Sequence, residues 1–155
     1  MSRTKLPATL IFLFMMLSAK AQTGEPFQLP DSWAKDFVIS LFYKGSMSGS
    51  NTEIRFTYDS CTYRSGSNSK KTKVYTCRMK EADRAAILKK LAELKVAQIK
   101  SESGMHVVYD GWSQSICIGT HCIDGGTSAE MSEQDKNVFL DAYRYLEEFA
   151  IKKTR

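Results

Sequence analysis

The chain has 155 residues, of which 43% are hydrophobic and 25% charged, and this balance excludes a disordered, collagen-like or coiled-coil protein. The formal net charge of +5 falls to about +2 without the first 21 residues, which hold three of the 22 basic residues and no acid. The remaining 134 residues suffice for one domain with its own core.

Residues 1–21 have the pattern of a cleaved signal peptide. Arg3 and Lys5 give a positive start, residues 10–17 are all apolar, and Ala19-Lys20-Ala21 is a small-x-small cleavage site. The apolar run is too short to cross about 30 Å of hydrocarbon, so we expect no membrane span. We expect cleavage after Ala21 and a soluble product exported to the periplasm or out of the cell. The leader followed by Gln22 resembles those of exported Gram-negative bacterial proteins.

The mature chain begins with an expected linker at residues 22–30, and one domain is expected at residues 31–155. Apolar residues alternate with others at 37–43 and again at 54–58, which predicts two strands joined by the Gly/Ser-rich connection 45–51. A hairpin at residues 61–79 should extend the same antiparallel sheet.

Helical periodicity follows the hairpin. A first helix is predicted from the spacing of four apolar residues, Ile87, Leu88, Leu91 and Leu94. Residues 106–109 resemble a strand, residues 113–123 a second hairpin, and Asp124-Gly125-Gly126 is expected to break the sheet. Ser132 then begins a capping pattern for a terminal helix.

This order of strands, helix, strands and helix predicts an α+β fold. We expect a single antiparallel sheet built from hairpins, with two helices packed on one face. The stretch from Met79 to Tyr109, in which a charged helix leads into Leu94-x-Val96-x-x-Ile99, resembles small exported bacterial α+β proteins of unknown function. The resemblance covers about a third of the chain and implies no catalytic residues.

Four cysteines in an exported protein favour disulfides. A turn at Gly119 and Thr120 would place Cys117 opposite Cys122 as a non-hydrogen-bonded pair, where side chains approach most closely. Cys61 and Cys77 are likewise symmetric about a turn-rich stretch, and that register sets Tyr63 against Tyr75. We therefore predict the bridges Cys61–Cys77 and Cys117–Cys122.

The positive charge is concentrated in residues 61–80, which carry +6 and no acid, whereas the rest of the mature chain sums to −4. Such a hairpin is suited to an anionic partner, although lysines on edge strands also serve to prevent aggregation. The candidate binding residues are Arg64, Lys70, Lys71, Lys73, Arg78 and Lys80 with Tyr63 and Tyr75. The expected partner is an anionic protein or cell-envelope component rather than nucleic acid.

No motif in the sequence identifies a catalysed reaction. His106 and His121 are the only histidines, and Gly45-Ser46-Met47-Ser48-Gly49 lacks the central serine of a nucleophile elbow. A metal site at Cys117, His121 and Cys122 has an unusual spacing for zinc, so we expect no metal and no cofactor. The preferred function is an exported, non-enzymatic binding or inhibitor-like module, and the alternative is a small secreted, nuclease-like hydrolase using His106 or His121.

Overall fold

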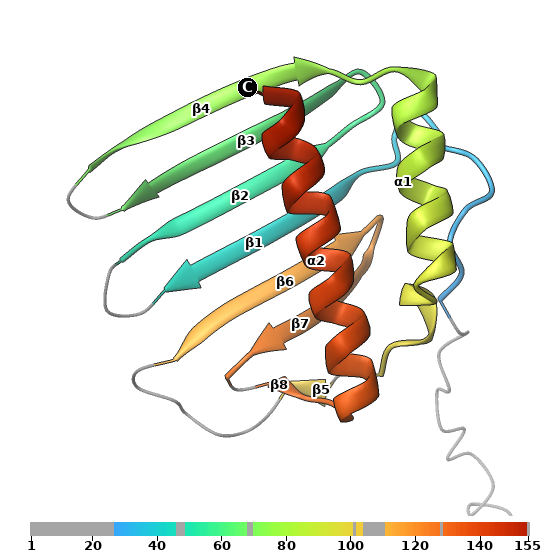
Figure 1. The fold of residues 1–155 in the computed structure, drawn as a ribbon, viewed down its shortest axis with the longest axis vertical. Helices are drawn as coiled ribbons and strands as arrows, with labels where there is room; N and C mark the ends of the chain where they lie inside the picture. Colours follow the sequence, from blue (N-terminus) through green and yellow to red (C-terminus); the bar gives the residue numbers. More distant parts are fainter. Residues whose placement is uncertain are drawn as a thin grey trace, which may run out of the picture.

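The computed structural model describes residues 27–45, 49–67, 70–100, 102–103, 111–127 and 129–154. Six strands form one antiparallel sheet in the order β4-β3-β2-β1-β6-β7, and a separate two-stranded pairing joins β5 to β8 (Figure 1). The strands are β1 Ile39–Gly45, β2 Asn51–Phe56, β3 Ser60–Ser67, β4 Lys70–Arg78, β5 Glu102–Ser103, β6 Trp112–Ile118, β7 His121–Gly126 and β8 Ala129–Glu130.

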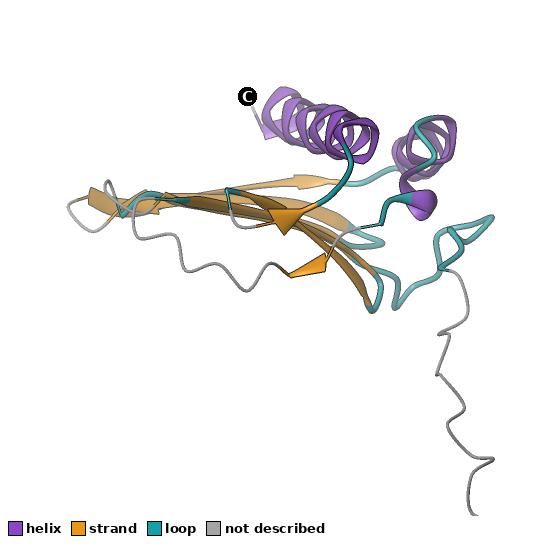
Figure 2. Ribbon diagram, turned by 90° about the horizontal axis from the view of Figure 1, so that it is seen from below, coloured by secondary structure: helices purple, strands orange, loops and turns teal. Residues whose placement is uncertain are grey.

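Two α-helices cover one face of the sheet. They are α1, Glu81–Glu93, and α2, Glu133–Thr154, and the short 3-10 helix η2, Val96–Gln98, follows α1. Figure 2 shows both α-helices on the same side of the strands. The predicted α+β fold, with one antiparallel sheet and two helices on one face, is confirmed.

The core lies between the sheet and these helices. Alternate strand residues point into it, so that Ile39 and Leu41 of β1 are fully buried, as are Ile54 and Phe56 of β2. The stripe predicted for the first helix is buried at Ile87, Leu88 and Leu91, while Leu94, the last of its four residues, is partly buried at the end of α1. From α2, the buried residues are Phe139, Ala142, Tyr143, Leu146 and Ala150.

The start of α2 is fixed by the predicted cap. Ser132 Oγ accepts a hydrogen bond from the Asp135 backbone N–H at 3.1 Å and donates one to the Asp135 carboxylate at 2.8 Å. These bonds satisfy an otherwise unpaired amide in the first turn and place a negative charge near the positive end of the helix dipole. The sequence pattern at Ser132 therefore predicted this boundary correctly.

The glycine pair near residue 125 departs from expectation. Gly125 and Gly126 do not break the sheet but are the last residues of β7. A Cβ on Gly125 would overlap the ring of Phe139 in α2, and Gly126 has a φ of 108°, which disfavours other residues. Gly125 thus lets α2 approach the strand closely, whereas a Cβ on Gly126 would meet the backbone of Trp112 and Ser113 in β6, and a local turn pattern reveals neither contact.

The expected linker also contributes to the packing. Phe27 and Leu29 are partly buried against the core, and the Phe27 ring stacks on His121 with centroids 4.3 Å apart. The predicted leader, the cleavage site and the strand expected at residues 106–109, with His106, lie outside the described residues.

The β6–β7 hairpin contains one of the predicted disulfides. Cys117 and Cys122 are bonded, with Cα atoms 4.0 Å apart. In the turn between the strands, Gly119 has a φ of 59° and Thr120 does not have a positive φ, which is the type II′ pattern expected for this loop. The bridge therefore forms at the closely spaced pair that the turn creates.

Cys61 and Cys77 lie directly opposite each other in β3 and β4, as predicted, but both are free thiols in this structure. The Met79 N–H donates a hydrogen bond to the Asp59 C=O at 2.9 Å, so Asp59 and Met79 are a hydrogen-bonded pair. Hydrogen-bonded and non-hydrogen-bonded pairs alternate along an antiparallel ladder, so Cys61 and Cys77, two residues along each strand, are also a hydrogen-bonded pair. In antiparallel sheets the Cα atoms of a hydrogen-bonded pair are about 5.5 Å apart, against about 4.5 Å in a non-hydrogen-bonded pair. Burial, and next the proximity of Cys77, raises the pKa of Cys61. The covalent bond between them remains a prediction.

Candidate binding site at the basic edge of the sheet

The outermost strand β4 carries most of the predicted binding residues. It pairs only with β3 among the described strands, and eight of its nine residues are exposed, Cys77 being half-buried. We call this strand together with Lys80 the basic edge, after its five cationic side chains, Lys70, Lys71, Lys73, Arg78 and Lys80. All five are exposed, so the structure brings these predicted residues together along one margin of the sheet.

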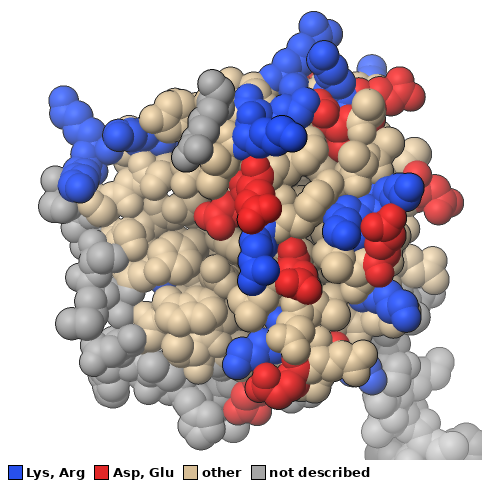
Figure 3. Space-filling model, in the orientation of Figure 1, with Lys and Arg blue, Asp and Glu red and all other residues tan. Residues whose placement is uncertain are grey.

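The cations of the basic edge form two groups. Lys70, Lys71 and Lys73 lie at the tip of the hairpin, whereas Arg78 and Lys80 lie at its base, where the chain leads into α1. Figure 3 shows cationic atoms at both places along this margin with uncharged atoms between them. Two acidic residues are close to the base: the Asp59 backbone carbonyl accepts a hydrogen bond from the Met79 N–H, and Glu81 directly follows Lys80 in the chain. The tip therefore has the larger excess of positive charge.

Apolar side chains occupy the centre of the edge. Val74 is 52% exposed and Tyr75 is 45% exposed, and they point to opposite faces of the sheet. Tyr75 lies on the helix side, where its ring is 6.4 Å from that of Tyr63, centroid to centroid. Large apolar groups of this exposure are few among the described residues, the others being Phe42 and Trp112.

Two of the predicted contact residues belong elsewhere. Arg64 lies on β3 and pairs across to Glu53 of β2 at 3.7 Å, on the face without helices. Both side chains of this pair are substantially exposed, at 54% and 37%, so it contributes at most about 1 kcal/mol. Tyr63 is half-buried and packs against the core. Neither residue is part of the basic edge.

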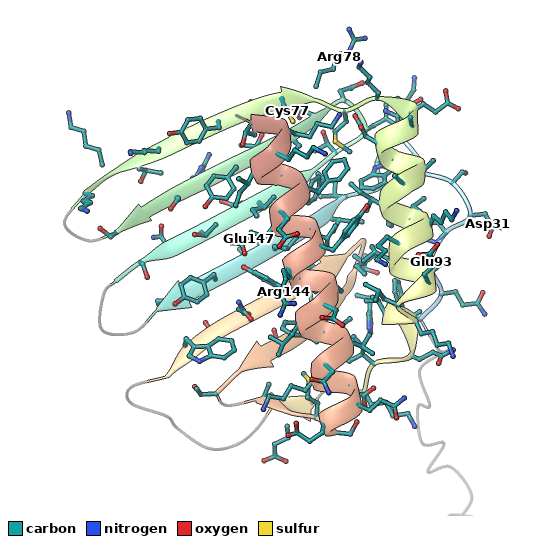
Figure 4. The ribbon with its side chains drawn as sticks, in the orientation of Figure 1. Asp31, Cys77, Arg78, Glu93, Arg144 and Glu147 are labelled. Carbon is teal, nitrogen blue, oxygen red and sulfur yellow. A yellow bond between two sulfur atoms is a disulfide. The ribbon has the colours of Figure 1, made fainter. Side chains whose placement is uncertain are left out.

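The C-terminal end of α2 lies beside the basic edge, which the sequence did not predict. Lys153 approaches the Asp83 carboxylate at 2.7 Å and thereby ties the last turn of α2 to the first turn of α1. Lys152 is exposed and adds a cation to this end of the molecule. Figure 4 shows Cys77 beside the end of α2 and Arg78 pointing away from the sheet beyond β4. The run of basic residues at the chain end was visible in the sequence, but its proximity to β4 is a long-range contact.

Asp83 is the best-buried carboxylate in this region and a link between elements. Its side chain is 12% exposed and also accepts the Lys80 backbone N–H at 2.9 Å. Burial opposes ionisation, but the hydrogen bonds from Lys153 and Lys80, together with their positive charge, outweigh it and lower the pKa of Asp83. This carboxylate thus links the two helices through Lys153 and lies close to the base of the edge, through Lys80, rather than to the tip lysines.

The face of the sheet opposite the helices contains a shallow hollow of about 600 Å³. Phe42 lies in its lining, with Lys44 and Arg64 as cations and Glu53 and Asp124 as anions. These formal charges cancel. The lining of the hollow therefore has no net formal charge, in contrast to the basic edge.

The candidate catalytic and metal residues do not assemble into a centre in the described part of the chain. His121 is half-buried with its ring stacked on Phe27. No group of three or more metal-ligating side chains is found among the described residues. His106 lies outside them, so its role is a sequence-based expectation only.

Comparisons with known proteins give no family for the chain: neither the models of protein families nor the curated proteins contain a match. Among the described helices, none is both long and apolar enough to span a membrane.

Proposed function

We propose that this chain is an exported, non-enzymatic binding or inhibitor-like module that captures an acidic protein through its basic edge. The observation that carries the proposal is the exposed outer strand β4 with three lysines at one end, an arginine and a lysine at the other, and Val74 and Tyr75 exposed between them. The leader pattern supports export, and the Cys117–Cys122 bridge suits an oxidising compartment.

Electrostatics favour an anionic partner at this surface. Exposed ion pairs contribute about 0.2–1 kcal/mol each, so several are needed together, and they also steer the encounter of the two proteins. The edge lysines are suited to this because Lys70, Lys71 and Lys73 form no ion pair within 4.0 Å with the described residues, in contrast to Lys136 and Lys153, which have carboxylate partners. The expected interaction weakens with salt, since the exposed charges are screened.

A protein fits this surface better than nucleic acid or a lipid headgroup. Nucleic-acid binding depends on a track of many phosphate contacts, whereas the cations here occupy one margin of the domain, and the mature chain outside residues 61–80 sums to −4. A lipid headgroup would use the cations but not the exposed Val74 and Tyr75. An acidic protein with some apolar surface uses both.

The hydrolase alternative has less support. Its candidate base His121 lines a hollow with Lys95 and Lys100, but neither a carboxylate nor a second histidine is among the described residues that line it, and the His121 ring stacks on Phe27. We therefore assign His121 to packing.

The test is capture of partners from an extract of exported proteins by the tagged mature chain. The variant Lys70→Glu/Lys71→Glu/Lys73→Glu should lose captured acidic proteins, because it reverses the tip of the basic edge. The matched control Lys35→Glu/Lys89→Glu/Lys100→Glu changes net charge equally at exposed lysines away from the edge and should capture as the unmodified chain does. Equal capture by the tip variant would overturn the basic edge as the binding site.

A further inference from the structure

The backbone of β4 offers hydrogen-bonding groups along its outer side. The Met79 N–H to Asp59 C=O bond sets the phase of the β3–β4 ladder, in which hydrogen-bonded and non-hydrogen-bonded pairs alternate. Cys77 and Tyr75 are therefore in hydrogen-bonded pairs with β3. Arg78, Thr76 and Val74 alternate with them and turn their N–H and C=O groups away from the sheet. Nothing else among the described strands pairs with these groups.

Only part of β4 pairs regularly with β3, and this part sets the length of edge that a docked strand could use. The register shifts between Ser65 and Ser67, so that Lys71 and Thr72 both oppose Gly66 as a bulge. Regular pairing therefore covers residues 73–78, a length of about 17 Å at 3.4 Å per residue. A docked segment of about six residues would match it.

The charge pattern along the edge differs from what protection against aggregation requires. Lysines protect an exposed strand most effectively at its centre, where they would prevent another strand from pairing. Here the centre holds Val74 and Tyr75, exposed by 52% and 45%, and Thr76. The cations lie at the two ends. This charge pattern would repel an apolar segment with cationic flanks and suits one with acidic flanks.

The opposite edge of the sheet is less accessible. β7 has six residues, its hairpin is closed by the Cys117–Cys122 disulfide, and Phe27 stacks on its first residue, His121. Of the two edges, β4 is thus the longer and the more exposed.

We infer that the outer edge of β4 binds its acidic partner by strand addition. An extended segment of that partner, with β-branched or apolar residues at its centre and acidic residues on both flanks, pairs with Val74, Thr76 and Arg78 through its backbone. Its central side chains pack on Val74 and Tyr75, and its flanks meet the lysines of the tip and the cations of the base. This inference rests on the proposed function and specifies how the same surface recognises its partner.

The experiment measures binding of a fluorescent ten-residue peptide, Thr-Val-Thr-Val flanked on each side by three acidic residues, by anisotropy. The variant Val74→Pro removes one outward N–H while keeping every charge and the bonds to β3, and proline is tolerated where a strand N–H faces solvent. The control Val74→Thr keeps the N–H. We expect Val74→Pro to weaken peptide binding at least tenfold and Val74→Thr to change it less than twofold.

Two outcomes separate this inference from the proposed function. Unchanged binding by a folded Val74→Pro variant, with binding lost on charge reversal of the tip lysines, would overturn strand addition but leave the acidic partner in place. Failure of the unmodified chain to bind this peptide would also overturn the inference, whereas capture of acidic proteins tests the proposed function separately.

A second measurement does not depend on the folding of a proline variant. A second peptide of the same sequence is N-methylated on all four central backbone amides, so that neither of its edges can donate hydrogen bonds to β4 there. Strand addition requires those donors, so the methylated peptide should bind at least tenfold more weakly than the unmodified peptide, although its charges are the same. Equal binding of the two peptides would overturn the inference.

Discussion

The contact between Asp83 and Lys153 gives the sharpest stability prediction, because one carboxylate joins the first turn of α1 to the last turn of α2. Asp83 accepts hydrogen bonds from Lys153 Nζ at 2.7 Å and from the Lys80 backbone N–H at 2.9 Å. Hydrogen bonds to charged groups contribute about 1.5–3 kcal/mol each when well buried. Lys153 is 32% exposed, which reduces its share, so Asp83→Asn should lower the free energy of unfolding by about 2 kcal/mol at pH 7.

The effect should depend on pH in a defined direction. The pKa of Asp83 is lowered in the folded state from its ordinary value of 3.8, so the ionised carboxylate stabilises the fold above that pH. As the pH falls from 3.8, the ordinary pKa that Asp83 has in the unfolded chain, to the lower pKa of Asp83 in the folded protein, this stabilisation is lost. The difference between the original chain and Asp83→Asn should therefore be constant from pH 6 to 8 and shrink below pH 4.

Urea unfolding followed by circular dichroism measures this difference. Asp141→Asn is the matched control, because Asp141 pairs with Arg144 on the surface of α2 at 3.8 Å with both side chains more than half exposed. That control should change stability by less than about 0.5 kcal/mol. An effect of Asp83→Asn no larger than the control, or one that persists undiminished at pH 3, would refute the assigned role of this contact.

Three further predictions address the hairpins, the helix packing and the charged edge. Replacing Cys117 and Cys122 with serine should cost about 2 kcal/mol in urea unfolding, because the bridge closes a loop of about six residues in the unfolded chain. Gly125→Ala should lower the melting temperature, at a cost of about 1–3 kcal/mol, because its Cβ meets the Phe139 ring, and Phe139→Leu in the same chain should recover part of the loss. Capture of acidic partners should decrease steadily as salt is raised from 50 to 500 mM, and capture that does not respond to salt would contradict an electrostatic contact.

The sequence predicted those parts of the fold that depend on local pattern. The stripe of Ile87, Leu88 and Leu91, the cap at Ser132 and the turn at Gly119 are each determined by residues within a few positions of one another. Strand pairing of Tyr63 with Tyr75 followed from the symmetry of the hairpin about its turn.

Features set by distant contacts were not predicted. Gly125 was interpreted as a sheet breaker because only α2, packed over it, explains why a glycine is needed inside a strand. Arg64 was grouped with the other cations by sequence distance, whereas its position one strand inward pairs it with Glu53. The five cations of the basic edge, four on β4 together with Lys80, were predicted from the local concentration of basic residues in the sequence. The exposed apolar residue Val74 between them was not predicted, because its exposure depends on the position of β4 at the edge of the sheet.

The lysines of the basic edge have two effects that are compatible. Two copies of the chain that paired β4 against β4 would bring their cationic tips and bases together, in either strand direction, and like charges across an interface disfavour that association. The same charges attract an acidic segment of a different protein. Protection against self-association and recognition of a partner are therefore consequences of one charge pattern, and they differ in what they require of the strand centre. Protection alone gives no reason to leave Val74 and Tyr75 exposed between the two cationic groups, whereas a docking strand needs an uncharged centre of this kind.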